Sequence, residues 1–404
     1  MAGVGHLNVG CRLNSCETEW LAAREARRLG VGIVEDLEAA DVIVLGTCCV
    51  TARSQSKSRK AARRLLTGTG ARIILTGCAA RLFPGDYPED PRLTREFCPD
   101  GPLSTPCGAF RSRGQLKIQD GCSNSCAYCA VPLARGPSRS FDRDEILQRA
   151  DSLAEAGFRE VVLTGVDIAS YGADRYGSSY GLAELLRDLL EPPRFRVRLG
   201  SLEPMRLGDG FLSGLALRGV CRHLHLSFQS ASTRVLSLMG RACTAEDVVS
   251  LSMEARRAFP GCILGGDLIT GFPGERDEDF AETMRLLDPD HGLMDYAHVF
   301  PFSPRPGTRA GAASGKRCPG SPSKERADAL RAASKARRTR YARSQAGEEL
   351  EVLVESRRIG GRLVGLSDNY VTVRVPAGSK PGELVRMRPS PGDILTGASE
   401  EELL

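Results

Sequence analysis

Hydrophobic residues in the first quarter of the chain form short runs that alternate with longer amphipathic stretches. The runs lie at 4–9, 41–45 and 72–75, and each is followed by a turn that contains glycine and cysteine. Stretches with helical spacing follow the first two runs, at 15–29 and 52–66. A repeated order of strand, turn and helix is typical of a parallel sheet. The pattern therefore predicts an α/β fold at the N-terminus.

The second half of this N-terminal part lacks the repeat. From residue 79 to 113, proline, glycine and charged residues dominate, and strand and helix no longer alternate clearly. We therefore expect an N-terminal domain over residues 1–113 whose second half is shortened or replaced by loop.

The alternation resumes in the middle of the chain, which we assign to a domain over residues 114–345. Apolar strands are expected at 115–119, 160–165, 195–200, 223–227, 262–269 and 295–300. Helical patterns lie between them at 142–156, 182–190, 233–238, 245–259 and 277–287. Six parallel strands with crossover helices fit either a doubly wound sheet or an incomplete barrel, and the pattern alone leaves both open.

Near the C-terminus the hydrophobic spacing changes to two, which is typical of strands. Short strands are expected at 348–355, 361–366, 369–375, 383–388 and 393–397. Five strands in so few residues predict a small β-barrel, over residues 346–404.

Composition narrows the class of protein. With 404 residues, 41% hydrophobic and 26% charged, the chain is typical of a soluble protein of two or three domains. It has neither a run of about 20 apolar residues nor a secretory pattern at the start, so we expect a cytoplasmic protein without a membrane partner. In that compartment, 14 cysteines favour metal ligands over disulfides. A net charge of +5 does not by itself identify a nucleic-acid partner.

Cys122, Cys126 and Cys129 stand at C-x3-C-x2-C spacing in one short loop. Three thiolates at this spacing can hold a four-iron cluster and leave one iron open, whereas four cysteines fill its coordination. The alternative is a zinc loop, but zinc needs a fourth ligand, and no second C-x-x-C or H-x3-H lies nearby. The loop therefore favours an iron–sulfur site.

Cys11, Cys48 and Cys78 follow three different strands of the N-terminal sheet. Because ligands gather at the carboxyl ends of parallel strands, we expect these thiols to converge on a second three-thiolate site. The alternatives are three unrelated core cysteines, or Cys49 in place of Cys48.

The loop at 119–129, together with Arg135-Gly136-Pro137 and the residues up to 140, resembles the signature of radical S-adenosylmethionine (SAM) enzymes. Its flanks are similar to those of the methylthiotransferases that modify tRNA, most of all those acting on N6-threonylcarbamoyladenosine. The motifs around residues 11, 48 and 78 resemble the N-terminal domain of the same family. This resemblance implies a partial (β/α)6 barrel, a C-terminal barrel like the TRAM module, and two [4Fe–4S] clusters with SAM as cofactors.

The resemblance also implies roles. The residues 122, 126 and 129 would bind the cluster that cleaves SAM, and residues 11, 48 and 78 an auxiliary cluster that supplies sulfur, methylated by a second SAM. The residues expected to contact SAM or substrate are Tyr128, Gly165, Ser201, Glu203, Gln229 and Asp267. No side-chain acid or base is expected, because the radical removes hydrogen from a C–H bond. The expected partners are the anticodon loop of tRNA and an electron donor.

Other functions stay open at this stage. Relatives methylthiolate isopentenyladenosine in tRNA or an aspartate of a ribosomal protein, and an iron–sulfur RNA-binding protein without catalysis is a third interpretation. The basic helix 324–343 is expected to face RNA, or else to be a solvated surface. The candidate RNA-binding residues are Lys335, Arg337, Arg338 and Arg340 on this helix and Arg374 on the terminal barrel. A second basic group lies on the helix that contains residues 53–64.

Overall fold

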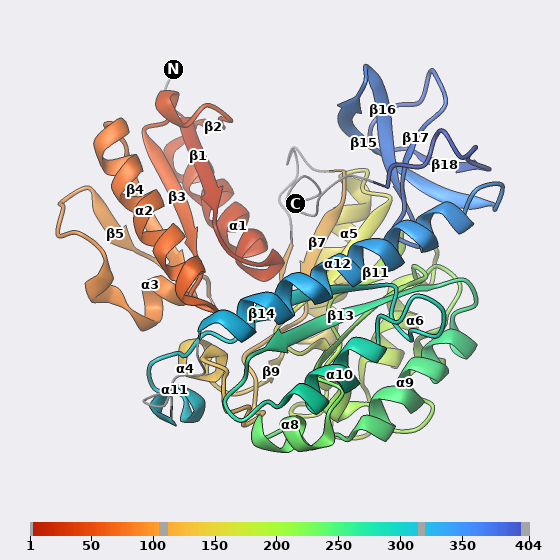
Figure 1. Cartoon of the computed structure of the whole chain (residues 1–404). Helices are drawn as coiled ribbons and strands as arrows, with labels where there is room; N and C mark the ends of the chain where they lie inside the picture. The colour runs from red at the N-terminus through yellow and green to blue at the C-terminus, as the bar shows by residue number, and fades with distance from the viewer. Residues whose placement is uncertain (1–2, 100, 105–111, 314–319, 397–404) are drawn as a thin grey trace.

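A computed structural model describes residues 3–99, 101–104, 112–313 and 320–396 (Figure 1). Its first unit is a five-stranded parallel sheet in the order β2-β1-β3-β4-β5. The strands are β1 (Gly3–Asn8), β2 (Gly32–Ile33), β3 (Val42–Thr47), β4 (Arg72–Gly77) and β5 (Leu93–Arg95). The helices are α1 (Arg12–Leu29), α2 (Ala52–Gly68), the short α3 (Cys78–Leu82), and the 3-10 turns η1 (Leu37–Ala39) and η2 (Pro84–Asp86). The parallel α/β prediction is confirmed.

The structure corrects two details of this unit. Helix α1 begins at Arg12 with Cys11 as its N-cap, three residues before the predicted start. The stretch after residue 79 is mostly loop, as expected, but β5 adds a parallel strand to β4 there. The pattern missed β5 because only Leu93 of its three residues is apolar.

The central unit has all six predicted strands in nearly the predicted places. They are β7 (Gly114–Lys117), β10 (Glu160–Thr164), β11 (Arg196–Leu199), β12 (His223–Gln229), β13 (Ile263–Thr270) and β14 (Tyr296–Pro301). The short strands are β6 (Leu103–Ser104), antiparallel to β7, and the pair β8 (Gln119–Asp120) and β9 (Arg139–Ser140). Parallel pairing joins β7, β10 and β11 in one sheet and β12, β13 and β14 in another. The bridge from Leu202 to Leu226 connects the two sheets, so the six strands form an open, partial barrel.

Most helices of this unit cover the outside of the barrel, whereas the short α4 (Val131–Arg135) and α11 (Arg309–Ala313) lie beside the cysteine loop (Figure 1). The others are α5 (Arg143–Glu155), α6 (Leu182–Leu190), α7 (Phe211–Leu215), α8 (Thr233–Leu238), α9 (Ala245–Ala258) and α10 (Asp277–Arg285), with 3-10 turns η3 (Ile168–Ser170) and η4 (Pro204–Arg206). The long helix α12 (Gly320–Ser344) lies along β14, where Ser334 Oγ accepts the Ala297 N–H at 2.8 Å. No helix in the described ranges is long and apolar enough to cross a membrane.

The C-terminal unit is a curled antiparallel sheet in the order β17-β16-β15-β18. Its strands are β15 (Leu350–Ile359), β16 (Arg362–Ser367), β17 (Thr372–Arg374) and β18 (Leu384–Met387). The predicted fifth strand is reduced to a bridge between Ile394 and Val373, and Gly397, its last residue, lies outside the described part. The shape agrees with a small barrel.

Buried charges fasten this terminal sheet to the central barrel. Glu160 is fully buried and pairs with Arg198 at 2.7 Å and with Arg196 at 2.6 Å. The two guanidinium groups also bind the terminal sheet: Arg196 donates to the Leu366 carbonyl at 3.1 Å and Arg198 to the Ser367 carbonyl at 2.9 Å. The three charged side chains therefore connect two adjacent barrel strands with the end of β16.

Candidate functional site

The predicted cysteine loop follows β8 and leads into α4, at the carboxyl end of the barrel. Gly121 starts the loop with φ 68°, and a Cβ there would lie 1.9 Å from the Pro137 carbonyl oxygen. Only glycine fits this turn, because other residues would clash and rarely adopt this φ. The Cys122 N–H then donates to the Gly136 carbonyl at 3.1 Å, which fixes the loop against the turn after α4.

Each of the three sulfurs of this loop has an N–H donor. Cys122 accepts from the Asn124 backbone at 3.4 Å, and Cys129 from the Val131 backbone at 3.4 Å. Cys126 accepts from the guanidinium of Arg241 at 3.7 Å. Donors to sulfur are typical of thiolates that ligate metal.

Burial makes free thiolates costly in this loop. It raises the pKa of Cys122 to about 11 and that of Cys129 to about 12. A group with positive metal charge is therefore needed to hold them ionised at neutral pH. The donor set, with three sulfurs and their N–H partners around one cavity, fits a three-cysteine iron–sulfur cluster.

A cavity of about 290 Å³ opens beside the loop at the ends of the barrel strands. Its walls include the three cysteines and five of the six residues predicted to contact SAM or substrate: Tyr128, Ser201, Glu203, Gln229 and Asp267. Gly165 is not among the lining residues, and a Cβ there would meet the Gln119 Oε1 atom at 2.9 Å. Val50 and Thr51 of the N-terminal unit close the cavity from the other side.

Arg241 organises this wall, although sequence reasoning did not single it out. Its side chain is fully buried and pairs with Glu203, while it donates to the Ser227 carbonyl at 2.7 Å and to the Tyr128 hydroxyl at 3.2 Å. Arg241 lies in a connection after α8 that carries no motif, so no sequence signal marks it. Its contacts fix the orientation of Glu203 and Tyr128 toward the cavity.

Asp267 is held by polar neighbours inside the barrel. It accepts from His225 at 3.1 Å and Ser227 at 3.2 Å, and His298 lies 3.4 Å away. Burial opposes its ionisation, but the two histidine rings hold the pKa of Asp267 well below its usual range. Gln229 adopts φ 71°, a left-handed conformation that is rare for residues other than glycine and is found at functional sites.

Cys11, Cys48 and Cys78 lie near one another at the edge of the N-terminal sheet. Burial raises the pKa of Cys48 to about 12, and the thiols of Cys11 and Cys78 act in the same direction. For Cys49 burial also dominates, but its nearest thiols are Cys78 and Cys48, and it packs in the apolar core. Of Cys48 and Cys49, Cys48 is therefore the residue whose thiol interacts with both Cys11 and Cys78. Cys78 accepts from Arg135 at 3.1 Å, and Arg135 ends the short helix that follows Cys129, so the two groups of cysteines lie on neighbouring segments.

The predicted RNA-binding residues differ in exposure. Lys335 and Arg340 are exposed, and Arg340 pairs with Asp290 at 3.0 Å on the surface. Arg337 is only 13% exposed and donates to the carbonyls of Met294 and Gly292. The other two also contact protein groups: Arg338 lies over the rings of Tyr296 and Tyr370, and Arg374 donates to the Gly392 carbonyl.

Comparison with known proteins agrees with this geometry. Residues 116–287 match the Radical SAM superfamily, and residues 4–92 match the family described as "Uncharacterized protein family UPF0004". The chain is 32% identical to the threonylcarbamoyladenosine tRNA methylthiotransferase MtaB of Bacillus subtilis, over 92% of this chain and 90% of that protein. It is 34% identical to MtaB of Thermotoga maritima, over 94% and 92%.

A solved structure shares the fold at low sequence identity. It is the radical SAM methyltransferase TsrM from Kitasatospora setae with cobalamin and a [4Fe-4S] cluster bound; the TM-score is 0.53 at 15% identity, over 79% of this chain and 80% of that one. With relatives above 30% identical along nearly its whole length, the chain belongs to the radical SAM methylthiotransferase family, a class of enzymes whose cofactors are [4Fe–4S] clusters and SAM.

Proposed function

We propose that this enzyme methylthiolates C2 of N6-threonylcarbamoyladenosine next to the anticodon of tRNA. The observation that carries the proposal is a cavity lined by Cys122, Cys126 and Cys129 whose wall also includes Val50 and Thr51, shortly after Cys48, in a chain whose relatives are named for that nucleoside. Cys122, Cys126 and Cys129 would hold one [4Fe–4S] cluster, and Cys11, Cys48 and Cys78 the other.

When bound, the two clusters and two SAM molecules supply a 5′-deoxyadenosyl radical and a methylated sulfur. The chain's own residues bind, orient and exclude water. Tyr128, held by Arg241, would support the adenine of SAM, and Glu203 would meet its polar groups together with Ser201. Ile269, Phe300 and Phe302 form an apolar wall that keeps water from a reactive radical.

The proposed reaction uses no side-chain acid or base. Asp267 faces His225 and His298, and we propose that this group orients SAM or the adenosine by hydrogen bonds. Removal of hydrogen from C2 needs a radical and not a base, so positioning is the task left to the protein. An external electron donor would reduce the first cluster.

Nucleoside analysis of tRNA tests the substrate. In a strain that lacks this gene, the 2-methylthio form of N6-threonylcarbamoyladenosine should disappear from digested tRNA. N6-threonylcarbamoyladenosine without the methylthio group should accumulate instead. Mass spectrometry separates the two by the added methylthio group. Loss of the methylthio form of isopentenyladenosine, with that of threonylcarbamoyladenosine unchanged, would refute the proposed substrate.

Exposed cations on two helices supply a surface for the tRNA backbone. Lys335 and Arg340 are exposed on α12, and Lys60 and Arg63 are exposed on α2. Thr51 caps α2 and also lines the cavity, so this helix begins at the cavity rim. The cations of α2 would hold phosphates while a base enters the cavity, and Arg340, beside Asp290 before the start of β14, would contact the tRNA farther from it.

Neutralising Lys335 and Arg340 together should weaken tRNA binding and flatten its salt dependence. The slope of log K against log salt should fall by roughly 0.7–0.9 for each phosphate that is no longer neutralised by a side chain. Binding of a labelled tRNA, measured over a series of salt concentrations, gives this slope. Arg337→Met is the matched control on the same helix: the Arg337 guanidinium donates to protein carbonyls, so its removal should leave the slope unchanged. A slope that is unchanged in the double variant would remove α12 from the interface.

A further inference from the structure

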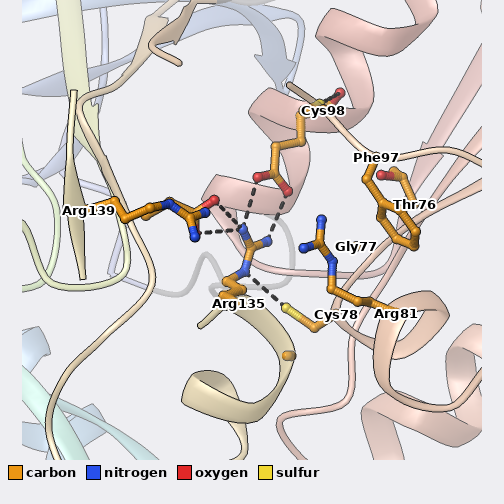
Figure 2. A pocket seen from close by; sticks show the side chains of 11 residues that line it. Thr76, Gly77, Cys78, Arg81, Phe97, Cys98, Arg135 and Arg139 are labelled. Carbon is orange, nitrogen blue, oxygen red and sulfur yellow. Dashed lines mark hydrogen bonds and ion pairs between the residues drawn. The ribbon is translucent and has the colours of Figure 1, made fainter. Parts of the chain in front are cut away.

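The guanidinium of Arg135, at the end of α4, has a protein acceptor for each of its five N–H groups. The Nε–H donates to the Cys78 sulfur at 3.1 Å. One terminal nitrogen donates to Glu17 at 2.9 Å and Asp120 at 3.0 Å, and the other to Glu17 at 2.9 Å and the Asn14 side chain at 2.6 Å. An arginine offers five donors in a fixed plane, so this group is fully used. Figure 2 shows Arg135 at the meeting point of several dashed contacts, one of which runs to the Cys78 sulfur.

These acceptors belong to segments that lie next to both groups of cysteines in the sequence. Glu17 and Asn14 lie in the first turns of α1, which starts directly after Cys11. Asp120 precedes the other cysteine loop and accepts the Gly121 N–H at 2.7 Å. One side chain therefore contacts a cysteine of the N-terminal group, the helix that follows another, and the strand that leads to Cys122.

Asn14 links Arg135 to the strand end that carries Cys48, the third cysteine of the N-terminal group. Its side-chain amide donates to the Thr47 carbonyl at 2.9 Å, directly before Cys48. The Thr47 hydroxyl in turn donates to the Thr76 carbonyl at 2.6 Å, two residues before Cys78. These contacts give a physical reason for the asparagine and threonines that accompany the cysteines in the sequence: they hold three strand ends in register with one another.

The buried charges of Arg135 and Lys117 balance those of Glu17 and Asp120. Lys117 is 2% exposed and donates to Glu17 at 2.8 Å and to Asp120 at 2.7 Å. Burial opposes ionisation of Asp120, but Arg135 and Lys117 lower its pKa to about 2. Two buried cations and two buried anions thus form a closed network, and a buried network of this kind is rigid only when every member is satisfied.

We propose that Arg135 is a positioning residue that tunes the auxiliary cluster: its Nε–H donates to the sulfur of Cys78, raises the reduction potential of that cluster, and fixes it relative to the loop of Cys122. The inference rests on the proposed function, because it requires a cluster on Cys11, Cys48 and Cys78. A reduced cluster carries one more negative charge than an oxidised one, so a donor to its sulfur ligand stabilises the reduced state more.

The experiment isolates the auxiliary cluster in the full-length chain. In a parent variant with Cys122, Cys126 and Cys129 all replaced by alanine, only the auxiliary cluster can contribute iron and an EPR signal after anaerobic reconstitution. Its midpoint potential is then measured by redox titration followed by EPR. Arg135→Lys, added to this parent, keeps the positive charge for Glu17 and Asp120 but removes the Nε–H beside Cys78. We expect about four irons to remain, with a midpoint potential more negative than that of the parent and an altered EPR spectrum.

Lys117→Arg is the matched control. It exchanges the same two side-chain types within the same network and conserves the charge, but the ammonium group at position 117 donates to the two acids and not to Cys78. We expect its midpoint potential to equal that of the parent. An equal negative shift in both variants would overturn a specific role for Arg135.

The remaining outcomes are also decisive. A parent that binds no iron would refute the auxiliary cluster itself, and with it the proposed function. If the parent holds about four irons and Arg135→Lys leaves both potential and spectrum unchanged, the function stands and the role of Arg135 is refuted. Loss of iron in Arg135→Lys alone would support positioning, whereas loss in Lys117→Arg as well would reduce Arg135 to one member of a structural network.

Discussion

Replacing Cys122 with alanine will lower the iron content from about eight to about four per chain and abolish release of 5′-deoxyadenosine from SAM. The three cysteines of this loop line the cavity, and each sulfur has its own N–H donor, so no spare thiol among the described residues of the loop can replace one of them. Iron analysis and chromatography of the SAM products after reduction measure the two effects.

Cys78→Ala provides the comparison that separates the two sites. It should also lower iron by about half, because it removes a ligand of the other cluster. It should still release 5′-deoxyadenosine, but yield no methylthiolated tRNA. If Cys78→Ala abolished SAM cleavage too, the proposed division of labour between the two groups of cysteines would be wrong.

Periodicity was enough to locate the elements that carry the site. The six barrel strands and five of their helices lie within a few residues of the predicted ranges, since each has a buried apolar face that leaves a regular pattern. The pattern did not decide between an open sheet and a partial barrel. That choice depends on two isolated bridges, Val197 with Val220 and Leu202 with Leu226, which join the two sheets and leave no pattern in the sequence.

The cysteines were also visible in the sequence, but the contacts that support them were not: no signal marked Arg241, and Arg135 stood in the motif Arg135-Gly136-Pro137 without an assigned role. Arg241 and Arg135 act through partners distant in sequence: Glu203 is 38 residues from Arg241, and Glu17 is 118 residues from Arg135. An arginine usually indicates solvent exposure, and only the fold reveals that Arg241, in a connection, and Arg135, at the end of α4, are buried. Sequence reasoning therefore finds ligands with a fixed spacing more readily than the residues that orient them.

The basic helix shows the opposite limitation. In the sequence, Arg337 and Arg340 are equivalent charges on α12. In the structure, the side chain of Arg337 is 13% exposed and that of Arg340 is 62% exposed. The difference arises because one face of the helix packs on β14, where arginine stems cover apolar surface and the guanidinium finds backbone carbonyls. Only exposed cations remain available to phosphates.

Replacing Glu160 with leucine will destabilise the junction between the central barrel and the terminal sheet by about 3–5 kcal/mol at pH 7. Glu160 is fully buried, and the change leaves the charges of Arg196 and Arg198 without their shared carboxylate. Desolvation would raise the pKa of Glu160, but the two arginines overcome it and hold the pKa far below the usual range for glutamate. Urea unfolding followed by far-ultraviolet circular dichroism measures the loss of stability.

The pH dependence of that loss tests its electrostatic cause. Because the folded pKa of Glu160 is depressed, its stabilising effect is present in full above the unfolded pKa of about 4.3 and is lost as pH falls below it. The stability gap between the two proteins should therefore be wide at pH 7 and narrower at pH 3.5. Glu349→Leu is the matched control, since Glu349 pairs with Arg388 on the surface and is 60% exposed, and exposed pairs contribute about 0–1 kcal/mol. If Glu160→Leu cost no more than this control, or if the gap did not change with pH, the buried carboxylate would not be what holds the two arginines and the terminal sheet in place.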